Sequence, residues 1–403
     1  MGTTRKIRMA TYLNDFKCIG GVCEDNCCIG WSVEIDKKTF LKYRNLKDVE
    51  LKKIVNKYVY KNEGCYDSKV DYGLVELKKN KHCPFLNDKK LCRLQAKLGE
   101  KYLSNVCAGY PRLVNEVNGI LEYSATISCP EIARLALANQ EGIEFQEKNA
   151  TNLKDDIINI YVNSTDNDNH SYVKYLQELR ELTIDILKSR KYPLWERILI
   201  IGLVFQMIQE FTDKNAVEKI PEQIKQFAKK MDHQGFKEEL RILPVNQLLQ
   251  LEILKEISDK FNDPNEIDSK KYLSFINEFY QGLGANKYHL LYKDFYKPFM
   301  DEKEYILENY LVNYVFQSLF PVAGNNQPFM DYEQLVIRYS LIKMYLIGIS
   351  GFRDGLTEPL VIEFIQSFSK GLEHNYTFFE KTGKYLQQKN YDTMYYTSIL
   401  IKN

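Results

Sequence analysis

The chain has 403 residues, of which 44% are hydrophobic and 27% are charged, so its composition is globular and excludes a disordered chain or a fibrous repeat. A single hydrophobic core stops growing at about 250–300 residues, so this length predicts two or three domains. The formal net charge is +1, but residues 1–134 carry 24 Lys and Arg against 16 Asp and Glu, whereas the remainder carries 31 against 38.

The basic N-terminal part, residues 1–134, contains no dense stripe of Lys and Arg. Electrostatic attraction between this part and the acidic remainder, or solvent-exposed charged faces, is therefore favoured over nucleic-acid binding. The longest apolar run, residues 198–205, is far shorter than the roughly 20 residues that span a bilayer. The charged first residues lack the apolar region of a signal peptide. We therefore expect a cytoplasmic protein with no nucleic-acid or membrane partner.

All nine cysteines lie in the first third of the chain, four of them in one short loop, and eight have motif-like surroundings. These eight are Cys18, Cys23, Cys27, Cys28, Cys83, Cys92, Cys107 and Cys129. Close spacing lets thiolates converge on a metal at little cost in chain entropy. The odd count and the missing signal peptide argue against a disulfide framework. Ordinary buried cysteines explain four in eleven positions poorly, so the cysteines predict a metal site.

The cysteine spacing also bears on which metal is bound. Gaps of four, three and zero residues differ from the paired CxxC knuckles of zinc sites and fit an iron–sulfur cluster at least as well. The spacing does not give the nuclearity; the cofactor that we expect is an iron–sulfur cluster, 4Fe-4S first, with zinc as the alternative. Side chains of adjacent residues diverge, so Cys27 and Cys28 either serve two centres or only one of them ligates. Cys65 stands alone in a segment typical of an exposed turn, and we expect it to be a bystander.

A β-hairpin is predicted at residues 112–128, where apolar and polar residues alternate around Asn118-Gly119, a pair that favours a type I′ turn. Pairing across this turn would bring Cys107 and Cys129 toward each other at the open end, with Pro111 interrupting the ladder before Cys107. A second short strand is expected at residues 70–77.

Apolar residues recur at helical spacing within 224–231, 335–346 and 361–372. The pair Gly282 and Gly284 follows a helical pattern and indicates a helix stop, not a glycine-rich cofactor loop. We expect an α+β, mostly helical chain. Residues 1–140 should form a cysteine-rich metal-binding α+β domain with the hairpin, and residues 141–403 an all-helical domain.

Several short motifs together resemble the flagellin lysine-N-methylases, part of a wider cysteine-rich group described as zinc- or iron-chelating. The motifs are Phe16-Lys17-Cys18, the segment 23–31, Cys83-Pro84-Phe85-Leu86, Cys92, the segment 107–112 and Ser128-Cys129-Pro130-Glu131, with further likeness at 314–321 and 368–375. The resemblance implies methylation of flagellin lysine ε-amines by S-adenosylmethionine. The spacing departs from the CxxxCxxC of radical enzymes that use this cofactor, so it does not support a radical mechanism.

The resemblance also points to individual site residues. Tyr110 and His374 match family positions and are catalytic candidates, and Glu131 follows Cys129-Pro130 closely enough to face the same site. A lysine amine with a pKa of about 10.4 is almost entirely charged at neutral pH, so methylation needs a base or desolvation. Arg112 is a candidate partner of the cofactor carboxylate and Trp31 a candidate cofactor platform. Core packing, helix capping and ion pairing are the alternative roles.

Two other functions remain compatible with the sequence. One is a non-catalytic iron–sulfur or zinc protein whose helical domain docks a partner, and the other is an electron carrier. Adding labelled S-adenosylmethionine and flagellin to the purified protein would separate the enzyme from both.

Overall fold

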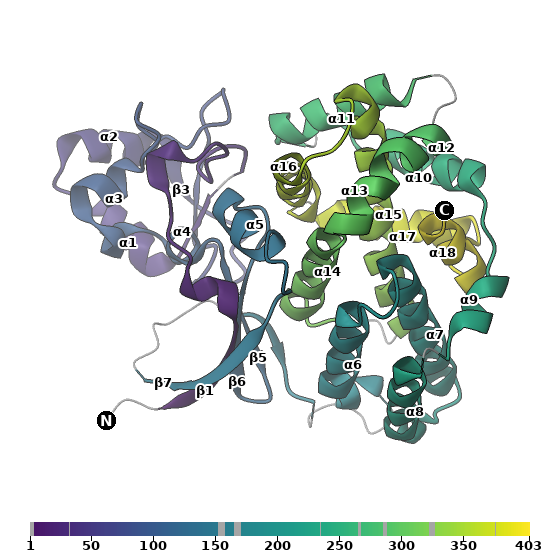
Figure 1. The fold of residues 1–403 in the computed structure, drawn as a ribbon. Helices are drawn as coiled ribbons and strands as arrows, with labels where there is room; N and C mark the ends of the chain where they lie inside the picture. The colour runs from purple at the N-terminus through teal and green to yellow at the C-terminus, as the bar shows by residue number, and fades with distance from the viewer. Residues whose placement is uncertain are drawn as a thin grey trace.

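The computed structural model describes residues 4–31, 33–151, 158–164, 171–233, 235–264, 267–284, 288–321, 327–374 and 376–403. In this part of the chain two sheets and their helices form the N-terminal region, and a large group of helices forms the rest (Figure 1). The expected α+β class and the helical C-terminal region are therefore confirmed.

The larger sheet has five strands in the order β7-β1-β6-β5-β8. The strands are β1 Arg5–Ala10, β5 Arg112–Val117, β6 Ile120–Ala125, β7 Phe145–Ala150 and β8 Ile158–Val162. Strand β1 pairs parallel with β6 and antiparallel with β7, and β5 pairs antiparallel with β6 and parallel with β8. The predicted hairpin is confirmed as β5–β6, and both turn residues, Asn118 and Gly119, have the positive φ angles of a type I′ turn.

The expectation of an all-helical chain from residue 141 onward is wrong, because β7 and β8 extend the sheet beyond that position. Strand β7 has no buried residue, since its sequence is Phe-Gln-Glu-Lys-Asn-Ala. A strand without a buried face carries no hydrophobic alternation that a sequence pattern can detect. Its backbone pairing with all six residues of β1 decides its conformation.

The smaller sheet has three strands in the order β2-β4-β3 and lies in the cysteine-rich region. Its elements are β2 Val33–Ile35, β3 Val59–Lys61, β4 Gly73–Val75, α1 Lys37–Arg44, α2 Val49–Tyr58, α3 Arg93–Leu98 and α4 Asn105–Gly109. Strand β4 confirms the strand expected at residues 70–77. This region has a separate core that includes Phe40, Tyr43 and Phe85, and Cys83 is part of it.

The other helices pack around a second, much larger core. They are α5 Pro130–Leu137, α6 Leu176–Lys188, α7 Leu194–Asp213, α8 Ile220–Asp232, α9 Lys237–Ile242, α10 Gln247–Phe261, α11 Lys270–Leu283, α12 Tyr288–Leu291, α13 Lys297–Lys303, α14 Tyr305–Gln317, α15 Pro328–Phe352, α16 Glu358–Phe368, α17 Tyr376–Gln388 and α18 Met394–Ile401. Two π-helical turns interrupt them, η6 Tyr292–Tyr296 and η7 Ser369–Glu373. Short 3-10 turns are η1 Thr11–Asn14, η2 Gly20–Val22, η3 Glu100–Tyr102, η4 Tyr172–Tyr175 and η5 Val217–Lys219. The three predicted helical stripes fall in α8, in α15, and in α16 continued by η7.

Helix α15 lies at the centre of the large core. By length and composition it would suffice to cross a membrane, but 83% of its apolar window is buried inside the protein, as in a core helix. Helix α11 packs directly against it, and a Cβ on Gly282 would lie 2.0 Å from the carbonyl oxygen of Gly348. This contact requires glycine. The predicted helix stop is confirmed, because α11 ends at Leu283 and Gly284 has a φ of 52°.

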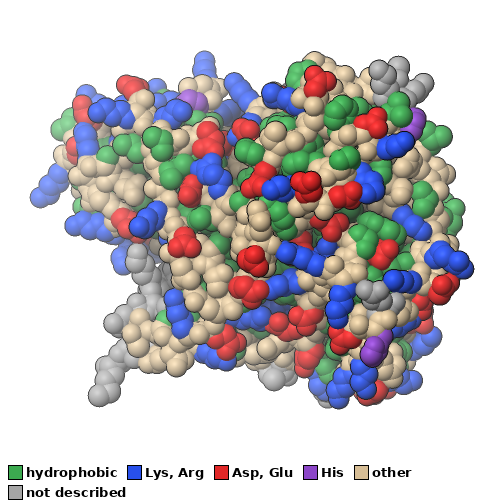
Figure 2. All heavy atoms as spheres, viewed as in Figure 1, with side chains coloured by type: hydrophobic (Ala, Val, Ile, Leu, Met, Phe, Trp, Pro, Cys, Tyr) green, Lys and Arg blue, Asp and Glu red, His purple; other side chains and the backbone are tan. Residues whose placement is uncertain are grey.

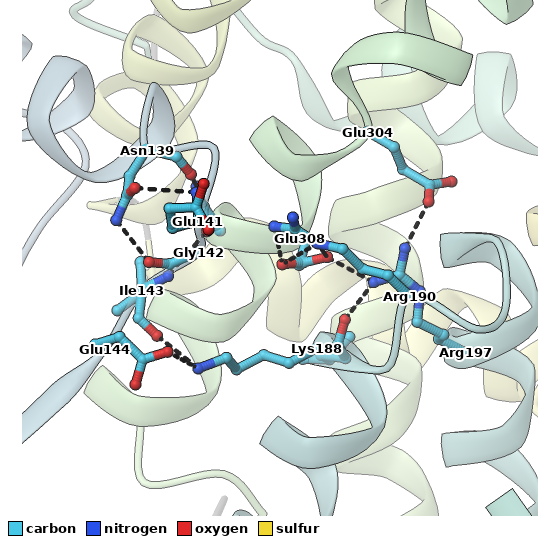
Figure 3. Close-up of polar contacts among 12 residues, drawn as sticks. Asn139, Glu141, Gly142, Ile143, Glu144, Lys188, Arg190, Arg197, Glu304 and Glu308 are labelled. Atoms are coloured by element: carbon cyan, nitrogen blue, oxygen red, sulfur yellow. Dashed lines mark hydrogen bonds and ion pairs between the residues drawn. The ribbon is translucent and has the colours of Figure 1, made fainter. Parts of the chain in front are cut away.

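A buried ion-pair network joins α7 to α14 (Figure 3). Glu308 accepts hydrogen bonds from Arg197 at 2.7 Å and from Arg190 at 2.8 Å, and the Arg197 and Glu308 side chains are each only 2% exposed. Glu304 accepts a further bond from Arg197 at 2.5 Å. The neighbouring Asn309 side chain donates to the Asn139 carbonyl at 2.8 Å, so α14 is also tied to the loop that precedes β7.

Replacing Glu308 by alanine should lower the free energy of unfolding by about 3 kcal/mol, because the buried Arg197 then loses the more buried of its two carboxylate partners. Urea denaturation of the variant and the wild type would measure the loss. The control is Glu380→Ala, which removes only an exposed partner of Lys384 and should leave the midpoint unchanged. Equal midpoints for Glu308→Ala and wild type would contradict a stabilising role for the network.

Candidate functional site

The Cys28 thiol lies between those of two other predicted cysteines, Cys27 and Cys83. Cys28 is hydrogen-bonded through its side chain to both Cys27 and Cys83, and the Cys83 amide donates to the Cys28 carbonyl at 2.8 Å. The hydrogen bond with Cys28 lowers the pKa of Cys27 to about 7, helped by the positive charge of Lys370. A lowered pKa favours the thiolate, which is the form that binds metals.

Four of the remaining predicted cysteines, Cys23, Cys92, Cys107 and Cys129, lie within electrostatic range of these three. Cys18 is exposed, and no contact joins it to the other thiols in the described structure. Cys107 lies within electrostatic range of Cys83, Cys92 and Cys27, and desolvation raises its pKa to about 12. Desolvation raises the pKa of Cys129 to about 11, and Cys129 lies within range of Cys23 and Cys27. The hairpin thus places Cys107 and Cys129 around the common neighbour Cys27.

Seven thiols, all but Cys18 and Cys65, thus form one neighbourhood of soft donors, and all nine cysteines are free. Among the described residues no group of three or more His, Cys, Asp or Glu side chains is arranged to hold a metal ion. An iron–sulfur cluster distributes its thiolates over several iron atoms, so its ligands need not converge on one point. By chemical type the donor set therefore fits a thiolate-bound cluster, whereas its geometry is not that of a single-ion site.

The expectation that Cys65 stands in an exposed turn without a partner is wrong. Cys65 is half-buried, and its thiol donates to Asp71 at 3.3 Å. The buried Asp71 carboxylate also accepts from the amides of Tyr66 at 3.1 Å and Asp67 at 2.9 Å. The turn-forming residues that suggested exposure instead wrap around this carboxylate, a contact that sequence pattern does not reveal.

A cluster of aromatic and hydroxyl side chains lies next to the loop of residues 18–30, which carries four cysteines and which we call the cysteine loop. We call Trp31, Tyr110, Ser128 and His374 the junction cluster, because they come from both parts of the chain. The buried Ser128 hydroxyl is 2.8 Å from His374 Nε2 and 3.2 Å from the Tyr110 hydroxyl. The Trp31 ring centroid is 5.3 Å from that of Tyr110 and 5.7 Å from that of His374. The structure thus brings together three of the five residues expected at the catalytic and cofactor site.

The hydrogen bonds of the junction cluster indicate its protonation. Thr126 donates to the Ser128 hydroxyl at 3.0 Å, which leaves the Ser128 proton free to be donated to His374 Nε2. Desolvation lowers the pKa of His374, although the residue as a whole is exposed. Desolvation, with Cys129 nearby, raises the pKa of Tyr110. At neutral pH the imidazole is therefore neutral, with its acceptor nitrogen bonded to Ser128, and the tyrosine stays protonated.

A second set of contacts, missed by the sequence analysis, fastens the helical part to the cysteine loop. Lys370 forms an ion pair with Asp25, and its Nζ is 3.3 Å from the Asn26 carbonyl. Gln366 donates to Asp25 at 2.9 Å and to the Ser128 carbonyl at 2.7 Å. Lys370 lies in the π-turn η7, and such turns are frequent at functional sites. The segment 368–375 is itself part of the family resemblance, but no sequence signal joins it to Asp25.

Two predicted site residues have other contacts. Glu131 pairs with Arg134 at 2.8 Å, and Arg134 also pairs with Glu24 at 2.5 Å. The guanidinium of Arg112 lies 5.0 Å from the centroid of the Phe16 ring, at the start of β5. Among the described residues Arg112 has no recorded ion pair, so its charge is available to a ligand.

Comparison with known proteins assigns most of the helical part. Residues 180–400 match the model of the FliB lysine N-methylase C-terminal domain. Lysine-N-methylases of Salmonella choleraesuis and Salmonella typhimurium are each 30% identical over 141 residues, 34% of this chain and 34% of theirs, so the match spans about a third of their length. The flagellar biosynthetic protein FliU of Salmonella muenchen is 31% identical over 140 residues, 34% of this chain and 80% of that protein. No solved structure matches.

Proposed function

The chain belongs to the FliB lysine N-methylase family, and from this premise we propose that it methylates lysine ε-amines of flagellin with S-adenosylmethionine as methyl donor. The family match over residues 180–400 carries the proposal. A relative named as a flagellar biosynthetic protein supports a flagellar substrate. We place the reaction in the cytoplasm, before flagellin is exported.

The junction cluster supplies the groups that this chemistry needs. A lysine amine must lose its proton before it attacks a methyl group, and the neutral His374 imidazole is the proposed acceptor. The proton would pass through Ser128, whose hydroxyl gives its own proton to Nε2 and takes one from the amine. Ser128 holds that imidazole in place through its contact with Nε2 at 2.8 Å, and the Tyr110 hydroxyl contacts Ser128 at 3.2 Å. The faces of Trp31 and Tyr110 attract cationic groups. In this proposal Arg112 binds the cofactor carboxylate. Glu131, which forms an ion pair with Arg134, stays a catalytic candidate.

Coexpression with the cognate flagellin tests the proposed function. Intact-mass and peptide mass spectra of the flagellin should show methyl-sized increments on lysines when the protein is present. Flagellin expressed alone is the control. An unchanged flagellin spectrum in the presence of folded, soluble protein would count against the proposal.

We further propose that the eight motif cysteines supply the ligands of an iron–sulfur site, 4Fe-4S first and zinc as the alternative. Each 4Fe-4S cluster takes four thiolates, so the eight would serve two clusters or include non-ligands. The closeness of Cys27, Cys28 and Cys83 and the lowered pKa of Cys27 support it. Brown, sulfide-containing protein after anaerobic purification is the expected result. Colourless protein with stoichiometric zinc would decide for the alternative.

Single substitutions should distinguish the metal-binding cysteines from Cys65. Cys27→Ser, Cys23→Ser and Cys107→Ser are expected to lose metal, since each removes a thiolate from the neighbourhood of Cys27. Cys65→Ser should keep full metal content, because a serine hydroxyl can still donate to Asp71. Metal and sulfide analysis of the four variants measures this. Loss of metal from Cys65→Ser as complete as from the other three would contradict the division.

A further inference from the structure

Two lysine-rich loops, residues 78–82 and 87–91, contact the cysteine loop. Residues 78–91 contain five lysines and a single acid, Asp88. We call Lys78, Lys79, Lys89 and Lys90 the lysine rim. All four are exposed, and in the described part of the chain none has a recorded carboxylate partner. In Figure 2, blue Lys and Arg side chains are frequent over the part of the molecule that contains α2, α3 and β3.

Backbone contacts attach both loops to the cysteine loop. The Gly30 amide donates to the Lys81 carbonyl at 3.0 Å, directly beside Trp31. The Asn26 side chain donates to the Lys90 carbonyl at 2.9 Å. A Cβ on Gly21 would lie 2.5 Å from the Lys89 carbonyl oxygen, so these two backbones are in direct contact. The lysine rim therefore stands at the edge of the proposed site.

Three acids next to the lysine rim already pair with other cations. Asp25 pairs with Lys370, Glu24 with Arg134 at 2.5 Å, and Asp268 with Lys81 at 2.9 Å. Asp88 is exposed and precedes Lys89, so within the described structure the four rim lysines face this one further acid and keep a net positive charge. Opposite charges across an interface steer association and fix its register, whereas like charges oppose it.

Apolar side chains accompany this charge. Val22 is 81% exposed and Leu91 is 39% exposed, and a Cβ added to Gly20 would lie 3.4 Å from a Leu91 methyl group. An exposed apolar pair beside the lysine rim suits a polypeptide that brings both carboxylates and apolar side chains. A nucleic-acid site would favour arginines and a longer basic stripe, and the rim contains neither.

We propose that the lysine rim binds an acidic segment of the protein substrate beside the lysine to be methylated, which rests on the proposed function. The target lysine approaches as a cation, so a basic rim would repel it on its own. Carboxylates next to it in the substrate reverse that repulsion. The rim thereby selects lysines in an acidic surrounding and is a determinant of specificity.

Fluorescence anisotropy with labelled peptides tests the proposal in the absence of methyl donor. One peptide carries glutamates on both sides of a single lysine, and a second carries glutamines in the same places. The glutamate peptide should bind wild type about fivefold more tightly, and added salt should reduce the difference because exposed charge pairs are weak and screened. Lys89→Glu/Lys90→Glu should abolish the difference.

The matched control is Lys52→Glu/Lys53→Glu, which reverses an equally exposed lysine pair on α2. This control should retain the preference for the glutamate peptide. The proposal is overturned if Lys89→Glu/Lys90→Glu keeps the preference, if the control loses it equally, or if a single-stranded oligonucleotide of matched charge displaces the glutamate peptide efficiently. The assay measures binding alone. Absence of methylation would therefore refute the proposed function and leave the result on peptide binding by the lysine rim unchanged.

Discussion

Replacing His374 by glutamine should lower the rate of lysine methylation about 100-fold or more, as expected when a general base is removed. Glutamine can still accept a hydrogen bond from Ser128, which is 2.8 Å from His374 Nε2, so the loss would report on proton transfer and not on packing. The rate is measured with labelled methyl donor and purified flagellin, and circular dichroism checks the fold.

The control for His374→Gln is His289→Gln, because His289 is an exposed histidine in α12 with no contact to the junction cluster. Its methylation rate should equal that of wild type. If His374→Gln methylates at the wild-type rate, the imidazole is not the base, and the amine must be deprotonated in another way.

Replacing Lys343 by methionine should increase the free energy of unfolding at pH 7, by about 3–4 kcal/mol from the pKa shift less one lost hydrogen bond. Lys343 lies in α15, is 3% exposed, and donates to the Ile401 carbonyl at 2.7 Å. Desolvation lowers its pKa from 10.5 to about 7, since no carboxylate compensates the buried charge. Methionine fills a similar volume without a charge.

The pH dependence of this effect has a definite sign. Between pH 7 and 10.5 the unfolded chain keeps the Lys343 proton and the folded chain has released it, so this residue makes stability rise with pH by about 1.4 kcal/mol per unit. Glu333, also in α15, acts oppositely, because desolvation raises its pKa from 4.5 to about 8 and stability falls as pH rises through that window. Together the two residues predict a stability minimum near pH 7–8.

Chemical denaturation of wild type and Lys343→Met across pH 6–10 measures the difference. The gain from the substitution should be constant below pH 7 and shrink toward pH 10.5. Lys384→Met, at an exposed lysine, should show no such dependence. A Lys343→Met variant less stable than wild type at pH 7 would mean that the amine is compensated in the folded state.

Local sequence patterns alone determined one hairpin, three helices and the family of this protein. The Asn118-Gly119 turn predicted the β5–β6 hairpin, because only a few residue types adopt two successive positive φ angles. Apolar spacing predicted α8, α15 and α16, because a helix that buries one face repeats it every few residues. The motif combination predicted the lysine N-methylase family, which the match over residues 180–400 confirms.

Long-range contacts were decided only by the tertiary structure. Strand β7 depends on pairing with β1, and Cys65 depends on the buried Asp71 carboxylate. The ion pair of Lys370 with Asp25 joins residues 345 positions apart. Such contacts leave no local period or turn signal, because each partner is an ordinary polar residue in its own segment. The chain specifies them only when packing of the helices against the cysteine-rich region brings the partners together.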